Sequence, residues 1–109
     1  LAEVAISAPL PEGRRMRGVV DRLLIEADRV LAVDFKSNRV LPETTAQVPA
    51  GIIVQMAAYA DALAQLYPDR RIDTAILWTR GAFLMPLDPD IVKQVDAMPP
   101  YLDVAGGEP

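Results

Sequence analysis

The chain has 109 residues, which is enough for one domain and too few for two. It contains no Cys and no His, which excludes disulfides, imidazole bases and thiolate or imidazole metal ligands, so a metal would have to be held by oxygen atoms. The net charge of −4 argues against a nucleic-acid binder that relies on overall positive charge, but it leaves room for a local basic track.

No stretch reaches the roughly 18 to 20 uncharged apolar residues that cross a membrane, and no basic and apolar leader opens the sequence. A cytoplasmic protein that does not engage a membrane is therefore expected. Because the chain starts at Leu1 rather than Met and ends in a Gly- and Pro-rich run, we expect a fragment of a longer protein, with one domain over residues 1–98 and a flexible tail over 99–109.

The first predicted element is a short strand over residues 2–8, where Val4 and Ile6 recur at period two. Glu3 in this strand is either a plain edge-strand acid or an extra metal ligand. Residues 12–17 are polar and predict a turn.

The next two segments, residues 18–27 and 30–37, are rich in Val, Leu, Ile and Phe. They are separated by Asp28-Arg29, which predicts a β-hairpin.

The rest of the chain alternates helix and strand. Apolar residues that recur at spacings of three and four predict a helix over residues 50–66, and Pro49 suits the first turn of that helix. The predicted elements are a loop over 38–48, a helix over 50–66, paired strands over 72–79 and 83–87, and a short helix over 89–98. This order indicates an α/β (α+β) fold.

A chemical site is predicted on the hairpin. A two-residue turn at Asp28-Arg29 sets Asp21 opposite Lys36 and diagonal to Asp34, while Asp34 and Lys36 share a face because they are two residues apart. Two carboxylates and one ammonium then converge. A loop of odd length would send Asp21 to the other face.

Diagonal neighbours on a sheet lie about 7 to 8 Å apart, which lets Asp21 and Asp34 lean onto one divalent ion. Two carboxylates about 4 Å apart repel by roughly 4 kcal/mol at an effective dielectric near 20, so a cation would relieve that repulsion. The alternative is that these acids are solvated or form surface ion pairs. Both acids interrupt apolar runs, Val19-Val20 and Val30–Val33, which strengthens the case for the buried site and leaves both interpretations open.

Three motifs in the same order as in a known family surround these residues. This chain resembles the RecB-like branch of the PD-(D/E)xK nuclease superfamily through Gly18-Val19-Val20-Asp21-Arg22, Val33-Asp34-Phe35-Lys36-Ser37-Asn38 and Gln55-Met56-Ala57-Ala58-Tyr59. The resemblance implies a restriction-endonuclease-like mixed sheet of about five strands with a packing helix, lacking the usual N-terminal helix. That branch usually carries a His on such a helix, and this chain has no His.

The run Ala75–Thr79 and the opening Ala2-Glu3-Val4 also look like the C-terminal part of the AddA-type helicase-nuclease subunits of break-repair complexes. This resemblance implies a single-strand DNA nuclease within an ATP-dependent helicase-nuclease that acts in recombination. The motor and its ATP site would lie upstream, and the parent protein would pair with an AddB-like subunit.

The resemblance also implies roles for individual residues. Asp21 and Asp34 would bind Mg²⁺ or Mn²⁺, which lowers the pKa of the attacking water. Lys36 would orient that water and stabilise developing negative charge. Gln55 and Tyr59, at i and i+4 on one helix, would face the site and position substrate or water.

DNA contacts are predicted from four arginines near the entry of the Asp21 strand, namely Arg14, Arg15, Arg17 and Arg22, with a solvated turn as the equal alternative. Trp78 and Phe83 are predicted to lie in the core, because each sits in an alternating strand pattern. A free-standing RecB-like or Cas4-like exonuclease and a non-catalytic DNA- or partner-binding domain of the same fold remain the competing functions.

Overall fold

The computed structural model describes residues 3–9 and 11–93. Its elements are β1 (Val4–Pro9), η1 (Pro11–Gly13), β2 (Arg15–Val20), β3 (Arg22–Ile25), β4 (Arg29–Lys36), η2 (Thr45–Gln47), α1 (Ala50–Leu66), β5 (Arg71–Trp78), β6 (Phe83–Pro86) and α2 (Pro89–Lys93). The α+β class is confirmed, and α1 has the predicted bounds. The predicted helix over 89–98 is described only to Lys93, and the tail over 99–109 lies outside the described residues.

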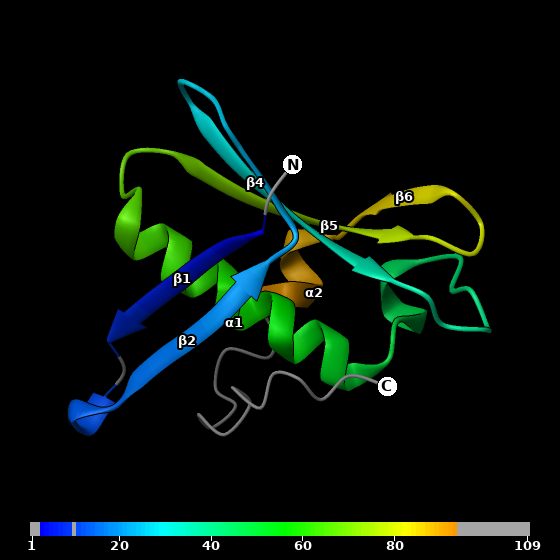
Figure 1. Ribbon diagram of the computed structural model, residues 1–109, viewed down its shortest axis with the longest axis horizontal. Helices are drawn as coiled ribbons and strands as arrows, with labels where there is room; N and C mark the ends of the chain where they lie inside the picture. The colour runs from blue at the N-terminus through cyan, green and yellow to red at the C-terminus, as the bar shows by residue number, and fades with distance from the viewer. Residues whose placement is uncertain (1–2, 10, 94–109) are drawn as a thin grey trace.

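The strands form two sheets rather than one sheet of about five strands. β1 and β2 make an antiparallel ribbon, and β3-β4-β5-β6 make a mixed sheet in which β4 and β5 are parallel. Helix α1 contacts β1 and β2 as well as β4 and β5, so it packs between the ribbon and the larger sheet (Figure 1). None of the helices in the described part of the chain is long and apolar enough to cross a membrane.

The predicted strand over 18–27 is wrong in one respect, because it breaks at Asp21. Residues before the break belong to β2, and residues after it belong to β3 in the other sheet. The predicted polar turn over 12–17 is also too long, because β2 already begins at Arg15. Met16 is buried between two exposed arginines and pairs with Ala8, so this arginine-rich segment alternates as a strand does.

The hairpin between β3 and β4 turns one residue earlier than predicted. The Glu26 amide donates to the Arg29 carbonyl at 2.8 Å, so Ala27-Asp28 forms the turn. An ion pair between Arg29 Nε and Glu26 Oε1, 3.0 Å apart, fastens this end. The observed register pairs Arg22 with Val33, which shifts the predicted pairing by two residues.

A two-residue shift leaves the faces unchanged, because side chains alternate with period two. Val30, Ala32, Asp34 and Lys36 therefore still share one face of β4. Parallel pairing with β5 puts Ile76 and Trp78 beside Asp34 and Lys36.

The core lies between this face and α1. Val30, Ala32 and Ile76 of the sheet belong to one buried cluster with Met56 and Leu63 of α1. Trp78 is fully buried in the same cluster, as predicted. Phe83 is 39% exposed, so its predicted place in the core is wrong. It begins the edge strand β6, where only one strand lies beside it.

Candidate active site

Asp34 and Lys36 form the centre of the site on β4. Lys36 Nζ lies 2.9 Å from Asp34 Oδ2, and both side chains are largely buried. Asp34 is 5% exposed, at the end of the apolar run that begins at Val30. Apart from this ion pair, Oδ2 of Asp34 has no hydrogen-bond partner among the described residues. One buried ammonium thus compensates one buried carboxylate.

Burial raises the pKa of Asp34 to about 6. The Lys36 ammonium lowers that pKa, while the carboxylate of Asp21 raises it by interacting with Asp34. The two acids are therefore close enough to repel each other. A cation between them would remove that repulsion and favour the ionised form of Asp34.

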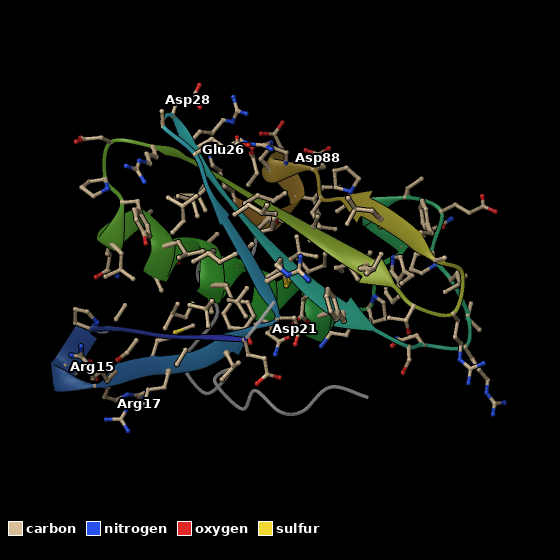
Figure 2. All side chains as sticks on the ribbon, turned by 45° about the horizontal axis from the view of Figure 1, so that its top comes forward. Arg15, Arg17, Asp21, Glu26, Asp28 and Asp88 are labelled. Carbon is tan, nitrogen blue, oxygen red and sulfur yellow. The ribbon has the colours of Figure 1, made fainter. Side chains whose placement is uncertain are left out.

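Asp21 occupies the bend between β2 and β3. Its Oδ2 accepts a hydrogen bond of 2.7 Å from the backbone amide of Phe35, the residue between Asp34 and Lys36. The Asp21 carboxylate thus accepts the hydrogen bond that a backbone carbonyl would accept if the pairing of β3 with β4 continued past Arg22. The break in the strand therefore aims the Asp21 carboxylate at β4. Figure 2 shows Asp21 where the ribbon meets the four-stranded sheet.

Gln55 and Tyr59 reach the site from α1. Lys36 Nζ donates a hydrogen bond of 3.1 Å to Gln55 Oε1, so the ammonium is held by both the carboxylate and the amide. The Tyr59 hydroxyl donates to the Val19 carbonyl at 3.1 Å. Burial raises the pKa of Tyr59 to about 12, and the negative charge of Asp34 acts in the same direction. Tyr59 is therefore a neutral phenol near pH 7.

The role of Gly18 in the site was not predicted from the sequence. A β-carbon at this position would lie 2.6 Å from Cε1 of the Tyr59 ring, closer than carbon atoms approach without displacement. Only glycine therefore lets Tyr59 reach the Val19 carbonyl. Gly18 and Tyr59 stand in separate motifs of the sequence, and no local pattern relates them.

The four arginines predicted to contact DNA do not gather at this site. Arg15 and Arg17 lie toward the far end of the ribbon from Asp21 (Figure 2), and Arg15 Nε donates to Ser7 Oγ at 2.8 Å. Arg14 is exposed in the turn before β2, and Arg22 is exposed on β3. The predicted role of this group in DNA binding stays a prediction.

The candidate metal ligands at this site are two carboxylates. Glu3 is exposed just outside β1, and within residues 3–9 and 11–93 no group of three or more acidic side chains could hold an ion by itself. Asp21 and Asp34 offer hard oxygen donors, and the buried Oδ2 of Asp34 has no partner among the described residues besides the Lys36 ammonium. These residues fit Mg²⁺ or Mn²⁺, which commonly takes one or two carboxylates and completes its shell with water and phosphate.

A mixed sheet with an acid at a strand break, an acid and a lysine on the next strand, and a glutamine and a tyrosine on the packing helix defines a nuclease-type domain. A family model described as the PD-(D/E)XK nuclease superfamily matches residues 1–105, and the chain belongs to this superfamily. Comparison with curated proteins and with solved structures yields no match to either. Members of the superfamily are phosphodiester hydrolases that generally use divalent metals.

Proposed function

We propose that this chain is a metal-dependent deoxyribonuclease domain that hydrolyses phosphodiester bonds in single-stranded DNA. The observation that supports it best is the position of Lys36 Nζ, 2.9 Å from Asp34 Oδ2 and 3.1 Å from Gln55 Oε1. An ammonium fixed by two partners beside a pair of acids is pre-oriented for a negatively charged transition state.

In this proposal Asp21 and Asp34 hold Mg²⁺ or Mn²⁺. When bound, the ion polarises the scissile phosphate and makes the attacking water more acidic. Lys36 orients this water and stabilises the charge that builds up on the phosphate oxygens. A bond forms between the water oxygen and phosphorus as the water loses a proton to solvent, the bond from phosphorus to the leaving nucleotide oxygen breaks, and that oxygen takes up a proton from solvent and ends as a hydroxyl.

Gln55 and Tyr59 are positioning residues in this scheme. Gln55 accepts from Lys36 Nζ and keeps the ammonium near Asp34. Tyr59, a neutral phenol bonded to the Val19 carbonyl, ties α1 to the end of β2 directly before Asp21. Neither side chain has to give up a proton.

We further propose that the domain belongs to an AddA-type helicase-nuclease that acts in double-strand break repair by recombination. The support is the set of three RecB-like motifs and the run Ala75–Thr79 at the end of β5. ATP would then act only on an upstream motor, the partners would be DNA and an AddB-like subunit, and the protein would be cytoplasmic. Motor motifs upstream in the parent gene would support this reading, and their absence would favour a free-standing exonuclease.

The test is cleavage of end-labelled single-stranded DNA by the full-length parent, with and without Mg²⁺. Lys36→Ala should reduce the cleavage rate by at least about 100-fold, because removing one group that stabilises developing charge typically costs that much. Lys93→Ala is the matched control, since Lys93 is the other lysine of the chain and is exposed on α2. If Lys36→Ala cuts as fast as Lys93→Ala, the catalytic assignment is wrong. Binding without any cleavage would instead support a non-catalytic domain.

A further inference from the structure

A second surface lies at the carboxyl ends of the parallel strands β4 and β5. It is an open hollow of about 720 Å³ whose lining includes Asn38, Arg39, Pro49 and Arg80. Figure 1 shows the loop after β4 and the turn between β5 and β6 side by side at this end of the sheet. Ser37, which directly follows Lys36 in the chain, also lines the hollow, so the hollow begins one residue beyond the candidate active site.

The walls of the hollow are held in place by contacts between its two loops. Arg80 Nε donates to the Ser37 carbonyl at 3.0 Å, and the Thr79 amide donates to the Lys36 carbonyl at 2.8 Å. Gly81 lies so close to Leu41 that a β-carbon there would be 2.8 Å from Leu41 Cδ1. The hollow is thus built by packing between the two loops.

The charge of the hollow is positive and uncompensated. Its lining contains Arg39 and Arg80 and no acidic residue. Arg39 makes no hydrogen bond or ion pair with a described residue, and Arg80 bonds only to a neutral carbonyl there. Pro49 caps the N-terminus of α1, whose first turn carries no acidic side chain, so the positive end of the helix dipole opens onto the same space.

We propose that this hollow binds the phosphate backbone of single-stranded DNA next to the scissile phosphate. Guanidinium groups bind phosphate through paired N–H donors, and two of them suit consecutive phosphates of one strand. The lining also contains Val40, which is 83% exposed, and Leu41, so an apolar wall faces the sugars and bases. This inference rests on the proposed nuclease function and assigns strand binding to Arg39 and Arg80 instead of Arg14, Arg15, Arg17 and Arg22.

The test measures binding without catalysis. A fluorescently labelled single-stranded oligonucleotide is titrated with the protein in EDTA over a range of salt concentrations, and anisotropy gives the Kd. Neutralising two phosphate contacts should lower the slope of log K against log salt by about 1.4 and raise the Kd about 20-fold near 0.1 M salt. The variant is Arg39→Gln/Arg80→Gln.

The matched control is Arg70→Gln/Arg71→Gln, which removes the same charge at the opposite end of β5. It should leave the slope unchanged. Arg39→Lys/Arg80→Lys should keep the slope because it keeps the charge. Since Arg39 bonds no described residue, Arg39→Gln alone should fold normally and lower the slope by about 0.7.

An unchanged slope in both Arg39→Gln and the double variant overturns the proposal. An equal decrease of the salt slope in the control variant also overturns it, and so does a decrease that is seen only in Arg14→Gln/Arg17→Gln. A poly-glutamate peptide that competes as well as the oligonucleotide would overturn the assignment to phosphate. Cleavage by the parent in Mg²⁺ is measured separately. If the double variant binds more weakly and the parent does not cleave, DNA binding by the hollow stands and the nuclease function is wrong. If the parent cleaves and the variant binds as tightly as the wild type, the nuclease function stands and the proposed role of the hollow is wrong.

Discussion

Gly18 and Tyr59 are in such close contact that the absence of a side chain on one sets the position of the other. A β-carbon on Gly18 would lie 2.6 Å from Cε1 and 3.4 Å from Cζ of the tyrosine. The ring has no room to yield, because it is 3% exposed and its hydroxyl is bonded to the Val19 carbonyl. This contact fixes α1 against β2 directly before the bend at Asp21.

Gly18→Ala should therefore destabilise the protein by about 1 to 3 kcal/mol, the usual cost of overpacking a buried contact, and should also slow cleavage by displacing Tyr59. Chemical denaturation measures the free energy of unfolding. Gly51→Ala is the control. It also replaces a glycine by alanine, this time in α1, and a β-carbon there would meet nothing within 4 Å. Because Gly51 lies in the first turn of α1, this substitution should raise the free energy of unfolding by at most about 0.5 kcal/mol. Equal effects of the two substitutions would contradict the steric account.

Asp34→Asn should make the protein more stable at pH 7, and this gain should disappear at low pH. The pKa of Asp34 is raised to about 6 from 3.8 by burial, so the folded state holds a proton that the unfolded state has released between these values. Stability of the wild type then falls as pH rises from about 4 to 6, by about 3 kcal/mol in total. Asparagine carries no proton to lose, so the variant should not show this fall.

The measurement is the difference in unfolding free energy between wild type and Asp34→Asn from pH 4 to pH 8. Asp69→Asn, an exposed acid, controls for the change in net charge. If Asp34→Asn is less stable than wild type at pH 7, Asp34 acts mainly as the structural partner of Lys36, and the reasoning from burial is wrong.

How much of this site the sequence predicts depends on whether an error in strand register is an even or an odd number of residues. The hairpin turn lies one position earlier than predicted, yet Asp34 and Lys36 keep the predicted face, because a register shift of two residues preserves the face of each side chain, and the bend at Asp21 brings its carboxylate to β4. The bounds of α1 followed from its apolar spacing and from Pro49. Local patterns of this kind predict the structure correctly because the tertiary contacts stabilise the same element that the pattern favours.

The break at Asp21 was not predictable from the local pattern. Residues 18–27 read as one apolar strand, but the chain passes from one sheet to the other at Asp21, and both sheets pack against α1, which is distant in the sequence. The hollow at Arg39 and Arg80 was missed for the same reason, since 41 positions separate these residues and only the parallel pairing of β4 with β5 brings their loops together. The strand character of Arg15–Arg17 did have a signal, which was Met16 between two arginines.

Divalent metal should stabilise the folded protein through Asp21 and Asp34. A ligand at about 100 times its dissociation constant adds roughly 2.7 kcal/mol to the free energy of unfolding, so thermal melting with Mg²⁺ or Mn²⁺ should shift upward. Asp34→Asn should abolish the shift, because one of two carboxylate donors is lost. Asp69→Asn should retain it. A shift of the same size in both variants would show that the ion binds elsewhere.

Tyr59→Phe separates the hydroxyl of this tyrosine from its ring. The substitution keeps the ring against Gly18 and removes the hydrogen bond to the Val19 carbonyl together with the contact between the hydroxyl and the Gln55 side chain. It should cost about 1 kcal/mol, since the carbonyl loses its side-chain donor. Because the hydroxyl has a pKa of about 12 and is already bonded, it supplies no proton near neutral pH, so the pH profile of cleavage should keep its shape while the rate falls. A change in the basic limb of that profile would mean that the phenol takes part in proton transfer.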